Sequence, residues 1–364
     1  MPPLARFLLV RLLLVPLSLL VVTVTLMGLL TMVPPEVRAM LYLSKREQDS
    51  TYQMTMDQLR LLTDRHIQLH HMEDPFPVQY AYWVGSVIKE GGGYSPSLKG
   101  KVFETLLRRT PVTVELTLYS LLLFIPLGVV SGLRAGWRPG SRLDLFFRFI
   151  AYIATSLPPF ITGFILLGVF YVFLNWFPPG RLGTVFSQEI LAPEFRHFTR
   201  LITIDSLLNG RLDIFVDAVR HLVLPVITAS LVHWATLGRI VRSAIIAEGR
   251  KPYLTAARSH GIPEKRLLWR HALHNILSPA LSSSALAAAS LFTGVFMVEI
   301  IFNLKGVADL LVHGSSYGLD VPIAMGFSVY SVCIILVIMF VLDVLRAILD
   351  PRSRESMIHG DTIG

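Results

Sequence analysis

The chain has 364 residues, of which 53% are hydrophobic and 16% are charged, and its mean hydropathy is +0.58. Soluble domains carry about a quarter charged residues, so this composition argues against a soluble protein. The formal net charge of +8 is compatible with nucleic-acid binding, but an excess of Lys and Arg is also typical of the cytoplasmic loops of membrane proteins. The positions of the basic residues, given below, favour the second interpretation. The single cysteine, Cys333, excludes an intrachain disulfide framework.

The first apolar segment follows Arg6 and Arg11 and covers residues 12–32. It is long enough to cross a bilayer, which requires about 20 apolar residues. It ends in Val33-Pro34-Pro35 and not in the small residues of a cleavage site. We therefore expect a retained first membrane helix and not a cleaved signal peptide.

Apolar segments of similar length recur along the chain and predict an all-α membrane protein with six transmembrane helices. The third segment is the longest, and Pro158-Pro159 predicts a bend within it. Splitting it at these prolines is the alternative, but each piece would be too short to cross alone, so we expect one kinked span. The six predicted spans are residues 12–32, 112–133, 145–174, 221–244, 276–298 and 323–349.

The basic residues of the loops predict the orientation. Every second loop and the C-terminal tail are rich in Lys and Arg, which identifies one side of the membrane as cytoplasmic and places both termini there. These residues are Arg134, Arg138 and Arg142, then Arg250, Lys251, Arg258, Lys265, Arg266 and Arg270, and finally Arg352 and Arg354.

The chain accordingly divides into four parts. Residues 1–33 hold the N-terminus and first helix, and residues 34–111 form an extracytoplasmic segment with a helix-like stretch at 54–68. The core of five further helices covers 112–350, and the cytoplasmic tail covers 351–364. We expect residues 34–111 to form a small subdomain. A second extracytoplasmic segment, after the third span, contains an amphipathic stretch at residues 195–208.

The cytoplasmic loop at residues 249–279 contains signals for two short helices. Pro252 near the start and Gly261 just past the end predict a helix at 252–259. Ala256 and Ala257 leave this helix bare on one side, so it can lie close against another protein.

A second helix is predicted at residues 264–276, with Pro263 before its first turn and Glu264 near the positive end of its dipole. It leads directly into the fifth span. Its apolar face is formed by Leu267, Leu268, His271 and Ile276.

This loop resembles that of ABC importer membrane subunits, whose pattern is E-A-A-x3-G-x9-I-x-L-P. Thr255-Ala256-Ala257 is followed after three residues by Gly261, with Thr255 in place of the family's glutamate. The distal part is Asn275-Ile276-Leu277-Ser278-Pro279, one position off the pattern. In the family this loop forms the coupling helix that lies in a cleft of the ATPase subunit. The resemblance implies that role for Thr255, Ala256, Ala257, Gly261, Ile276 and Pro279.

Further short motifs resemble the membrane subunits of dipeptide, oligopeptide and nickel ABC importers over most of the chain, and in the family's order. The departures are Pro34-Pro35-Glu36 after the first helix, the stretch Gly91-Gly92-Gly93-Tyr94-Ser95, and residues 34–74, which have no clear counterpart. The matching motifs are Arg11-Leu12-Leu13-Leu14, Met32-Val33-Pro34, Pro77-Val78-Gln79-Tyr80, Thr105 to Pro111, Ser156-Leu157-Pro158-Pro159-Phe160, Trp176-Phe177-Pro178, Phe302-Asn303-Leu304-Lys305-Gly306 and Leu349-Asp350-Pro351-Arg352.

The resemblance implies half of a translocation pathway in a bacterial cytoplasmic membrane. A second homologous permease, two ATPase subunits and an extracytoplasmic substrate-binding protein are the implied partners, besides the lipid bilayer; nucleic acid is not one. Peptides are the default cargo, and nickel or another small solute stays open. The sequence has no G-x-x-x-x-G-K-[ST] phosphate loop, so ATP and Mg²⁺ are expected on the ATPase subunits and no cofactor on this chain.

Two other classes are a channel and a polytopic membrane enzyme. The sequence shows no paired acid and base, nucleophile constellation or H-E-x-x-H motif on a plausible scaffold. A coupling loop would have no purpose in either class. The chain is therefore expected to be non-catalytic.

Charged residues inside spans are candidates for function. We expect Glu115 to lie one turn from the start of its helix, where the dipole accommodates it, and Arg148 to extend to the cytoplasmic interface. Asp343 and Arg346 are expected to form a local pair.

Three residues of the fifth helix are candidates for the translocation pathway. Ser282 and Ser283 belong to a small-residue face suited to close packing or to lining a pore. Glu299, just beyond the predicted fifth span, could line the outer mouth.

The histidines His66, His70 and His71 raise the question of a metal site. His66 and His70 are four residues apart and could share a helix face as ligands. We favour ordinary solvated residues and predict no metal site.

Overall fold

The computed structural model describes residues 3–40, 42, 54–95, 97–315 and 320–349, which are mostly helical. Two compact units are present: unit 1 is built mainly on residues 112–304, and unit 2 on residues 11–111 and 305–336. Helices α1 (Pro3–Thr31), α6 (Val102–Trp137) and α16 (Val321–Leu349) contribute residues to both units. The predicted tail at 351–364, with Arg352 and Arg354, lies outside the described residues.

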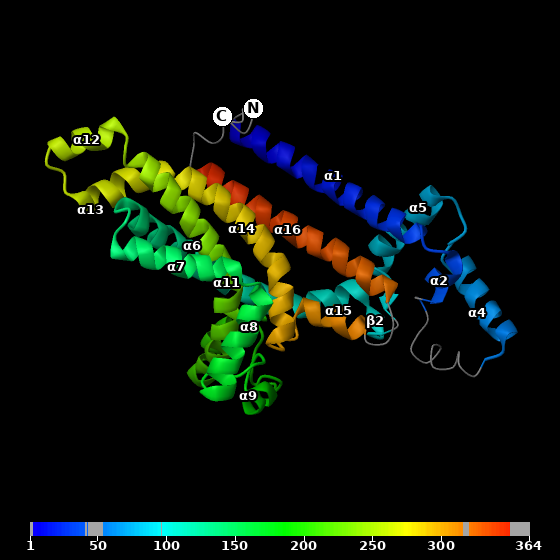
Figure 1. Ribbon diagram of the computed structural model, residues 1–364. Helices are drawn as coiled ribbons and strands as arrows, with labels where there is room; N and C mark the ends of the chain where they lie inside the picture. Colours follow the sequence, from blue (N-terminus) through cyan, green and yellow to red (C-terminus); the bar gives the residue numbers. More distant parts are fainter. Residues whose placement is uncertain (1–2, 41, 43–53, 96, 316–319, 350–364) are drawn as a thin grey trace. The chain divides into compact units, whose positions relative to one another are not determined.

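Helix α11 (Leu212–Glu248) is at the centre of unit 1. It packs against α14 (Leu273–Ile301), α7 (Arg142–Ser156), α8 (Pro159–Leu167) and α10 (Ile202–Leu208). The largest buried apolar cluster lies in this unit and includes Leu116, Phe124, Leu133, Leu237, Ile245, Leu254, Leu267, Leu291 and Phe302. Figure 1 shows the short helices α12 (Pro252–Ser259) and α13 (Glu264–Arg266) at one end of α11, and α9 (Thr184–Glu189) towards its other end.

Helices α6 and α11 approach each other closely at glycines. A Cβ atom at Gly132 would lie 2.3 Å from the backbone oxygen of Gly238, so no larger residue fits there. Small residues are the usual means by which membrane helices bring their backbones together. The sequence of α6 thus fixes its packing against α11.

The third predicted span bends at the prolines. Leu157 is extended (φ −102°, ψ 130°) and Pro158 precedes α8, because the residue before a proline is driven out of the helical region. The axes of Arg142–Ser156 and Pro159–Phe173, the latter ending in the π-helical stretch η1 (Gly168–Phe173), differ by 103°. The predicted bend is confirmed at this position, and it is sharp enough for either a broken span or a re-entrant loop.

The segment between η1 and α11 folds into a small cap on unit 1. It contains α9 and α10, and its residues Leu182, Phe195 and Ile202 form an apolar cluster with Ile214 and Ala218 of α11. The amphipathic stretch at residues 195–208 is helical only in its second half, α10. The carboxylate of Asp205 accepts the backbone N–H groups of Thr199 and Arg200, at 2.8 and 2.9 Å, and holds the first half as a turn.

In unit 2, α1 is followed by α2 (Pro35–Met40), α4 (Met56–Leu69), α5 (Phe76–Glu90), the short antiparallel pair β1 (Tyr94–Ser95) and β2 (Gly100–Lys101), and α15 (Val307–Ser315). The helix predicted at 54–68 is confirmed as α4. It begins with a capping box, in which the Thr55 and Gln58 side chains bind each other's backbone N–H groups.

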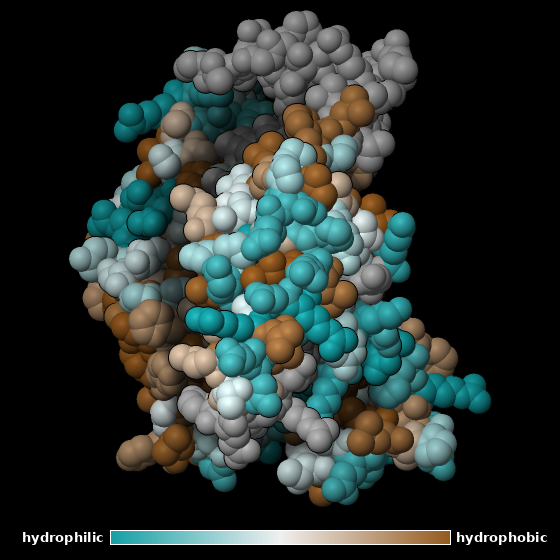
Figure 2. Space-filling model, turned by 90° about the vertical axis from the view of Figure 1, so that its right-hand side faces the viewer, coloured by the Kyte–Doolittle hydropathy of each residue, from teal (hydrophilic) through white to brown (hydrophobic). Residues whose placement is uncertain are grey.

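The face drawn in Figure 2 mixes hydrophilic with hydrophobic residues and shows no continuous apolar belt.

The described residues contain four helical segments long and apolar enough to cross a membrane: Leu13–Thr31, Val102–Trp137, Leu212–Glu248 and Val321–Val341. The bent pair of α7 and α8 would be a fifth, and Ala287–Ile301 is a shorter apolar helix within α14. The chain is a polytopic membrane protein.

Helix α6 begins at Val102, ten residues before the predicted span. Pro111 therefore lies inside it and does not mark its start. Glu115 consequently lies more than three turns into the helix, and the prediction that it sits one turn from the start is wrong.

Candidate functional site

The loop at residues 249–279, predicted to be cytoplasmic, contains the predicted helices. Helix α12 covers Pro252–Ser259, as the proline and glycine signals predict. Gly261 follows at φ +73°, a left-handed conformation that glycine adopts without strain. Its N–H binds the carbonyl of Arg258 at 2.9 Å, which closes the turn between the two helices.

Only one face of α12 is attached to the rest of unit 1. Leu254 is fully buried in the main apolar cluster, and Ala257 packs against the same cluster. Thr255 and Ala256 are exposed. Of the two alanines expected to be bare, Ala256 is, but Ala257 is half-buried, because it lies one turn from Leu254.

The second predicted helix runs without a break into α14. Its first turns are α13 and a π-helical stretch, η2 (Leu267–Ala272). Leu267, Leu268 and Ile276 are buried and His271 is half-buried, so the predicted apolar face is confirmed. Pro279 lies within the backbone of α14, and its side chain is outside the described part of the chain.

A buried carboxylate joins α12 to both neighbouring helices. Glu248, the last residue of α11, is 5% exposed. Its Oε1 accepts the hydroxyl of Tyr253 at 2.7 Å and the Nδ2 of Asn275 at 2.8 Å, and its Oε2 pairs with the Nζ of Lys251 at 2.7 Å. The Nδ2 of Asn275 also donates to the hydroxyl of Tyr253 at 2.9 Å. We name these four residues the Glu248 cluster.

Burial and, second, the hydrogen bond to Glu248 raise the pKa of Tyr253 to about 12. The phenol therefore keeps its proton at neutral pH, and its hydroxyl donates a hydrogen bond to the carboxylate. Glu248, Tyr253 and Asn275 could not be recognised as a cluster from the sequence, because their spacing has no helical or strand period and Asn275 is far along the chain.

Arg258 holds the end of α12 against its surroundings. Its Nε pairs with Glu264 at 2.9 Å, and its guanidinium lies 5.5 Å from the ring centroid of Trp137. Arg134 lies in the same way over Trp269, at 5.9 Å. Such contacts contribute about 0.5–1 kcal/mol each at exposed sites, so they orient the loop more than they stabilise it.

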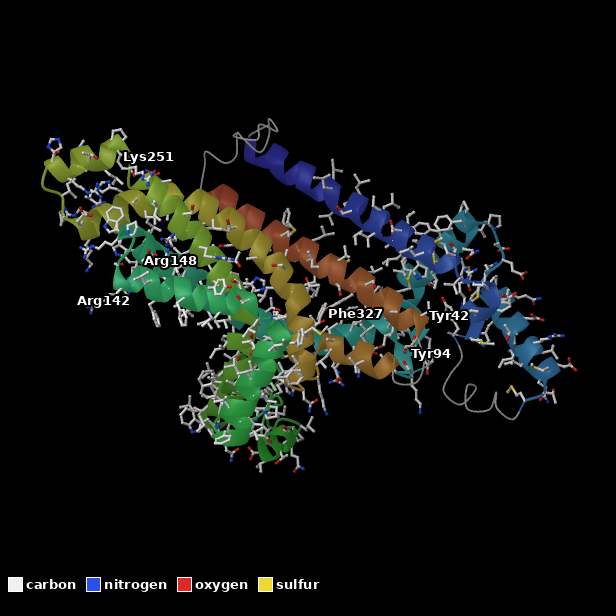
Figure 3. All side chains as sticks on the ribbon, viewed as in Figure 1. Tyr42, Tyr94, Arg142, Arg148, Lys251 and Phe327 are labelled. Atoms are coloured by element: carbon white, nitrogen blue, oxygen red, sulfur yellow. The ribbon has the colours of Figure 1, made fainter. Side chains whose placement is uncertain are left out.

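The surface around α12 is strongly basic. Figure 3 shows Lys251 at the end of α11, with Arg142 and Arg148 on α7, which packs against α11. Asp144 of α7 joins the two helices through Arg242, at 2.5 and 2.9 Å. In the described residues no ion pair involves the exposed side chains of Arg250, Lys265, Arg266 and Arg270.

The three pathway candidates lie on α14. Ser283 is half-buried, and the side chain of Ser282 is outside the described part of the chain. Glu299 is 1% exposed and accepts a hydrogen bond from the hydroxyl of Thr113 on α6. It lies within the last turn of α14 and not beyond the helix.

Of the other charged candidates, Glu115 makes contacts within the protein and Arg148 is exposed. Glu115 is buried and accepts the N–H and hydroxyl of Thr203 at 2.8 and 2.6 Å, while its second oxygen pairs with Arg181 at 3.0 Å. These contacts tie α6 to the cap. Arg148 is exposed on α7. The side chains of Asp343 and Arg346 are outside the described residues.

The histidines form a stack in unit 2. The rings of His66 and His70 are 6.0 Å apart, and His70 stacks on Tyr42 at 4.2 Å, while His71 pairs with Asp74 at 2.7 Å. Among the residues that the structure describes, no three His, Cys, Asp or Glu side chains converge as metal ligands.

Comparison with known proteins assigns the chain to a family. Residues 125–355 match the family described as the binding-protein-dependent transport system inner membrane component. The chain is 31% identical over 290 residues to the oligopeptide transport system permease protein AppB of Bacillus subtilis (strain 168), covering 79% of this chain and 84% of that protein.

Two further relatives are similar over comparable lengths. The di/tripeptide transport system permease protein DppB of Pseudomonas aeruginosa (strain UCBPP-PA14) is 30% identical, covering 83% of this chain and 89% of the relative. The probable D,D-dipeptide transport system permease protein DdpB of Escherichia coli (strain K12) is 32% identical, covering 77% and 81%. The chain therefore belongs to the family of inner membrane components of binding-protein-dependent transport systems, the membrane subunits of ABC importers.

Proposed function

We propose that this chain imports peptides across a bacterial cytoplasmic membrane as one of two permease subunits, with α12 as its contact to an ATPase. The peptide cargo is supported by the names of three relatives, which are permease proteins of oligopeptide, di/tripeptide and D,D-dipeptide transport systems. The second permease, a pair of ATPase subunits and an extracytoplasmic binding protein complete the proposed complex. ATP and Mg²⁺ bind to the ATPase subunits, and this chain is non-catalytic.

The proposed topology has six spans with both termini in the cytoplasm. Four apolar helices, the bent pair of α7 and α8 as one kinked span, and α14 make up the six. The basic residues of the α6–α7 and α11–α14 connections support the same cytoplasmic side for both loops, in keeping with the positive-inside rule.

The observation that carries the proposal is the attachment of α12. One face is anchored by the buried Leu254, and Thr255 and Ala256 project from the other with nothing covering them in unit 1. A helix of eight residues is too short to be stable on its own in water. Its fold is therefore maintained by unit 1, and its outer face, with small side chains, is open to a partner subunit.

The mechanism follows from this arrangement. ATP binding closes the ATPase pair, α12 follows the cleft in which it lies, and the spanning helices of the two permeases alternate between outward-open and inward-open states. ATP drives this population shift because it binds the two states with different affinity. Ser282, Ser283 and Glu299 on α14 are the proposed pathway residues of this chain.

Affinity purification of the chain from its native membrane in mild detergent, with mass spectrometry of the eluate, tests the complex. We expect an ATPase, a second permease and a binding protein, whose genes and ligands define the cargo. A homo-oligomer without an ATPase would contradict the proposal and direct attention to a channel. A binding protein that retains nickel would replace the peptide cargo and leave the rest intact.

The docking role of α12 is tested by Ala256→Glu, which places a charged side chain on its exposed face. We expect the ATPase to be lost from the purified complex while the amount of permease in the membrane is unchanged. Ala81→Glu is the control, because Ala81 is an equally exposed alanine on α5, on the proposed extracytoplasmic side. Equal retention of the ATPase by both variants would contradict docking at α12.

A further inference from the structure

Three helices meet at the Glu248 cluster. Glu248 ends α11, Tyr253 lies in the first turn of α12, and Asn275 lies in the first turn of α14. Each of the three side chains bonds to the other two, at 2.7, 2.8 and 2.9 Å. The cluster is therefore a closed triangle with one corner on each helix.

This triangle is a major part of the attachment of α12. The helix buries one side chain fully, Leu254, and an apolar contact of this kind is non-directional and lets a helix slide or rock over its neighbour. Hydrogen bonds behave differently, because they weaken steeply when the angle or distance departs from the optimum. A displacement of α12 relative to α11 or α14 by about 1 Å would break contacts of the cluster.

Breaking these contacts is unfavourable because the carboxylate is buried. Glu248 is 5% exposed, and a buried charge that loses its partners is strongly destabilising. Its partners Lys251, Tyr253 and Asn275 are themselves exposed residues, so the carboxylate is the buried member of the cluster. The three helix ends are therefore held at fixed positions when a force acts on α12.

We infer that Glu248, Tyr253 and Asn275 are positioning residues that make α12, the end of α11 and the start of α14 move as one body. Movement imposed on α12 then reaches both spanning helices and is not lost in rocking of the loop. The inference rests on the proposed function, because it requires an ATPase docked on α12. Lys251 neutralises the carboxylate and is not needed for the transmission itself.

Tyr253→Phe tests this in the complete transporter, because it removes one hydroxyl from the triangle and changes little else. The reporter is Met297→Cys, an exposed position on α14, in a Cys333→Ala background that removes the only native thiol. A membrane-impermeant maleimide is the probe, and its reaction rate is measured without nucleotide and with ATP and vanadate. ATP hydrolysis is measured in the same vesicles.

We expect nucleotide to change the labelling rate in the parent, and Tyr253→Phe to reduce this change by about fivefold or more, because the hydroxyl makes two hydrogen bonds and one net bond of ~1 kcal/mol already corresponds to about fivefold. ATP hydrolysis and the amount of complex should stay within about twofold of the parent, since the docking face is untouched. Tyr152→Phe is the matched control, because Tyr152 is 72% exposed on α7. It should leave the nucleotide response unchanged.

A double-mutant cycle separates transmission from simple stability. The cycle consists of Tyr253→Phe, Asn275→Ala and the double variant that carries both. The effects of the two substitutions on the nucleotide response should be non-additive, because both act on one triangle. If hydrolysis, labelling response and quantity of complex fall in proportion, the cluster is merely structural and the inference is overturned. An unchanged response in Tyr253→Phe overturns it as well.

Failure of the inference is distinguishable from failure of the proposed function. If Ala256→Glu removes the ATPase but Tyr253→Phe leaves the nucleotide response intact, α12 docks the ATPase and the inference alone is wrong. If the parent shows no nucleotide response and no associated ATPase, the proposed function itself is contradicted.

Discussion

The two connections that flank α11 in unit 1 are built in contrasting ways. The cap, residues 174–211, precedes α11, and the part of the proposed coupling loop that lies before α14, residues 249–272, follows it. Each is tied to a spanning helix by a buried glutamate: Glu115 of α6 for the cap and Glu248 of α11 for the loop. The cap packs on α11 through a separate apolar cluster, which includes Ile214 and Ala218 of α11, whereas the loop adds side chains such as Leu254 to the main cluster of the spanning helices.

From this difference we expect the cap to be the more rigid of the two connections. The carboxylates of Asp205 and Asp217 add hydrogen bonds to the cap, at 2.8 Å to Thr199 N–H and 2.7 Å to Gly183 N–H. The loop contributes Leu254, Leu267, Leu268 and Ala272 to the main apolar cluster and adds the Glu248 cluster. A connection that packs into the cluster of the spanning helices is expected to move with them. We therefore expect single substitutions to affect stability in the cap and energy coupling in the loop.

The largest effect is expected from Leu254→Ala. It removes the apolar anchor of α12, and a large-to-small change at a fully buried leucine costs about 3 kcal/mol. We expect the ATPase to dissociate from the purified complex at temperatures where the permease is still folded, with the melting temperature of the permease, followed by tryptophan fluorescence in detergent, lowered by several degrees. Leu207→Ala, an exposed leucine of the cap, should have no effect on either quantity, and retention of the ATPase by Leu254→Ala would contradict the contrast.

The second-largest effect is expected from Arg181→Ala, which changes the cap. It leaves the carboxylate of Glu115 buried with only Thr203, and because Arg181 is partly exposed we expect a loss of about 2 kcal/mol, below the range for a fully buried pair. Limited proteolysis should cut residues 174–211 faster, with transport and ATP hydrolysis falling in proportion. Arg196→Ala, an exposed arginine of the same segment, is the control. A change in the ratio of transport to hydrolysis would show that the cap takes part in coupling.

Gly261→Ala tests the turn between the two loop helices. The position has φ +73° and no atom within 4 Å of an added Cβ, so the cost is conformational and about 1 kcal/mol. We expect weaker association of the ATPase, by about fivefold, when binding is measured by surface plasmon resonance on nanodiscs. Gly140→Ala provides the control, since it is a turn glycine at φ +78° with the same open space. Equal effects of the two substitutions would show that the turn has no special role.

The smallest effect is a pH dependence of unit 2. Burial, followed by the nearby His66 and His71, lowers the pKa of His70 to about 4. In the unfolded chain the ring takes up a proton below about pH 6.5, whereas in the folded protein it stays neutral down to about pH 4. The stability that depends on the neutral ring is therefore fully present above pH 6.5 and is lost as the pH falls towards 4.

We expect the melting temperature to fall between pH 6.5 and 4, and less steeply in His70→Gln than in the parent. His260→Gln, which changes an exposed histidine of the coupling loop, should reproduce the parent's pH profile. An identical slope in the parent and in His70→Gln would exclude this residue as the cause.

The coupling loop was the most predictable part of the fold, because its signals are local. Pro252 and Gly261 predict the bounds of α12, and Pro158 predicts the bend of the third span, since both act through the conformation of one or two residues. The start of α6 was not predicted, because the span at 112–133 was placed on apolar residues and the helix begins ten residues earlier. The helix continues through Pro111 from Val102, and Glu115 was misassigned as a consequence.

Tertiary contacts set the limit of the sequence analysis. The turn around Thr199 is held by Asp205, and the triangle of Glu248, Tyr253 and Asn275 joins residues with no periodic spacing. Each side chain alone is an ordinary polar residue of a loop or helix end. Only the fold brings them together, so their role could not be read from the pattern. The roles of Thr255 and Ala256 stay predictions until a partner is identified.

A photo-crosslinking amino acid at Ala256, in the complex purified from its native membrane, tests the central claim most directly. Ala256 is on the exposed face of α12, next to the anchored Leu254, so the probe contacts whatever docks there. The account predicts a covalent adduct with an ATPase subunit, identified by mass spectrometry. An adduct only with lipid, or with a second copy of this chain, would contradict it.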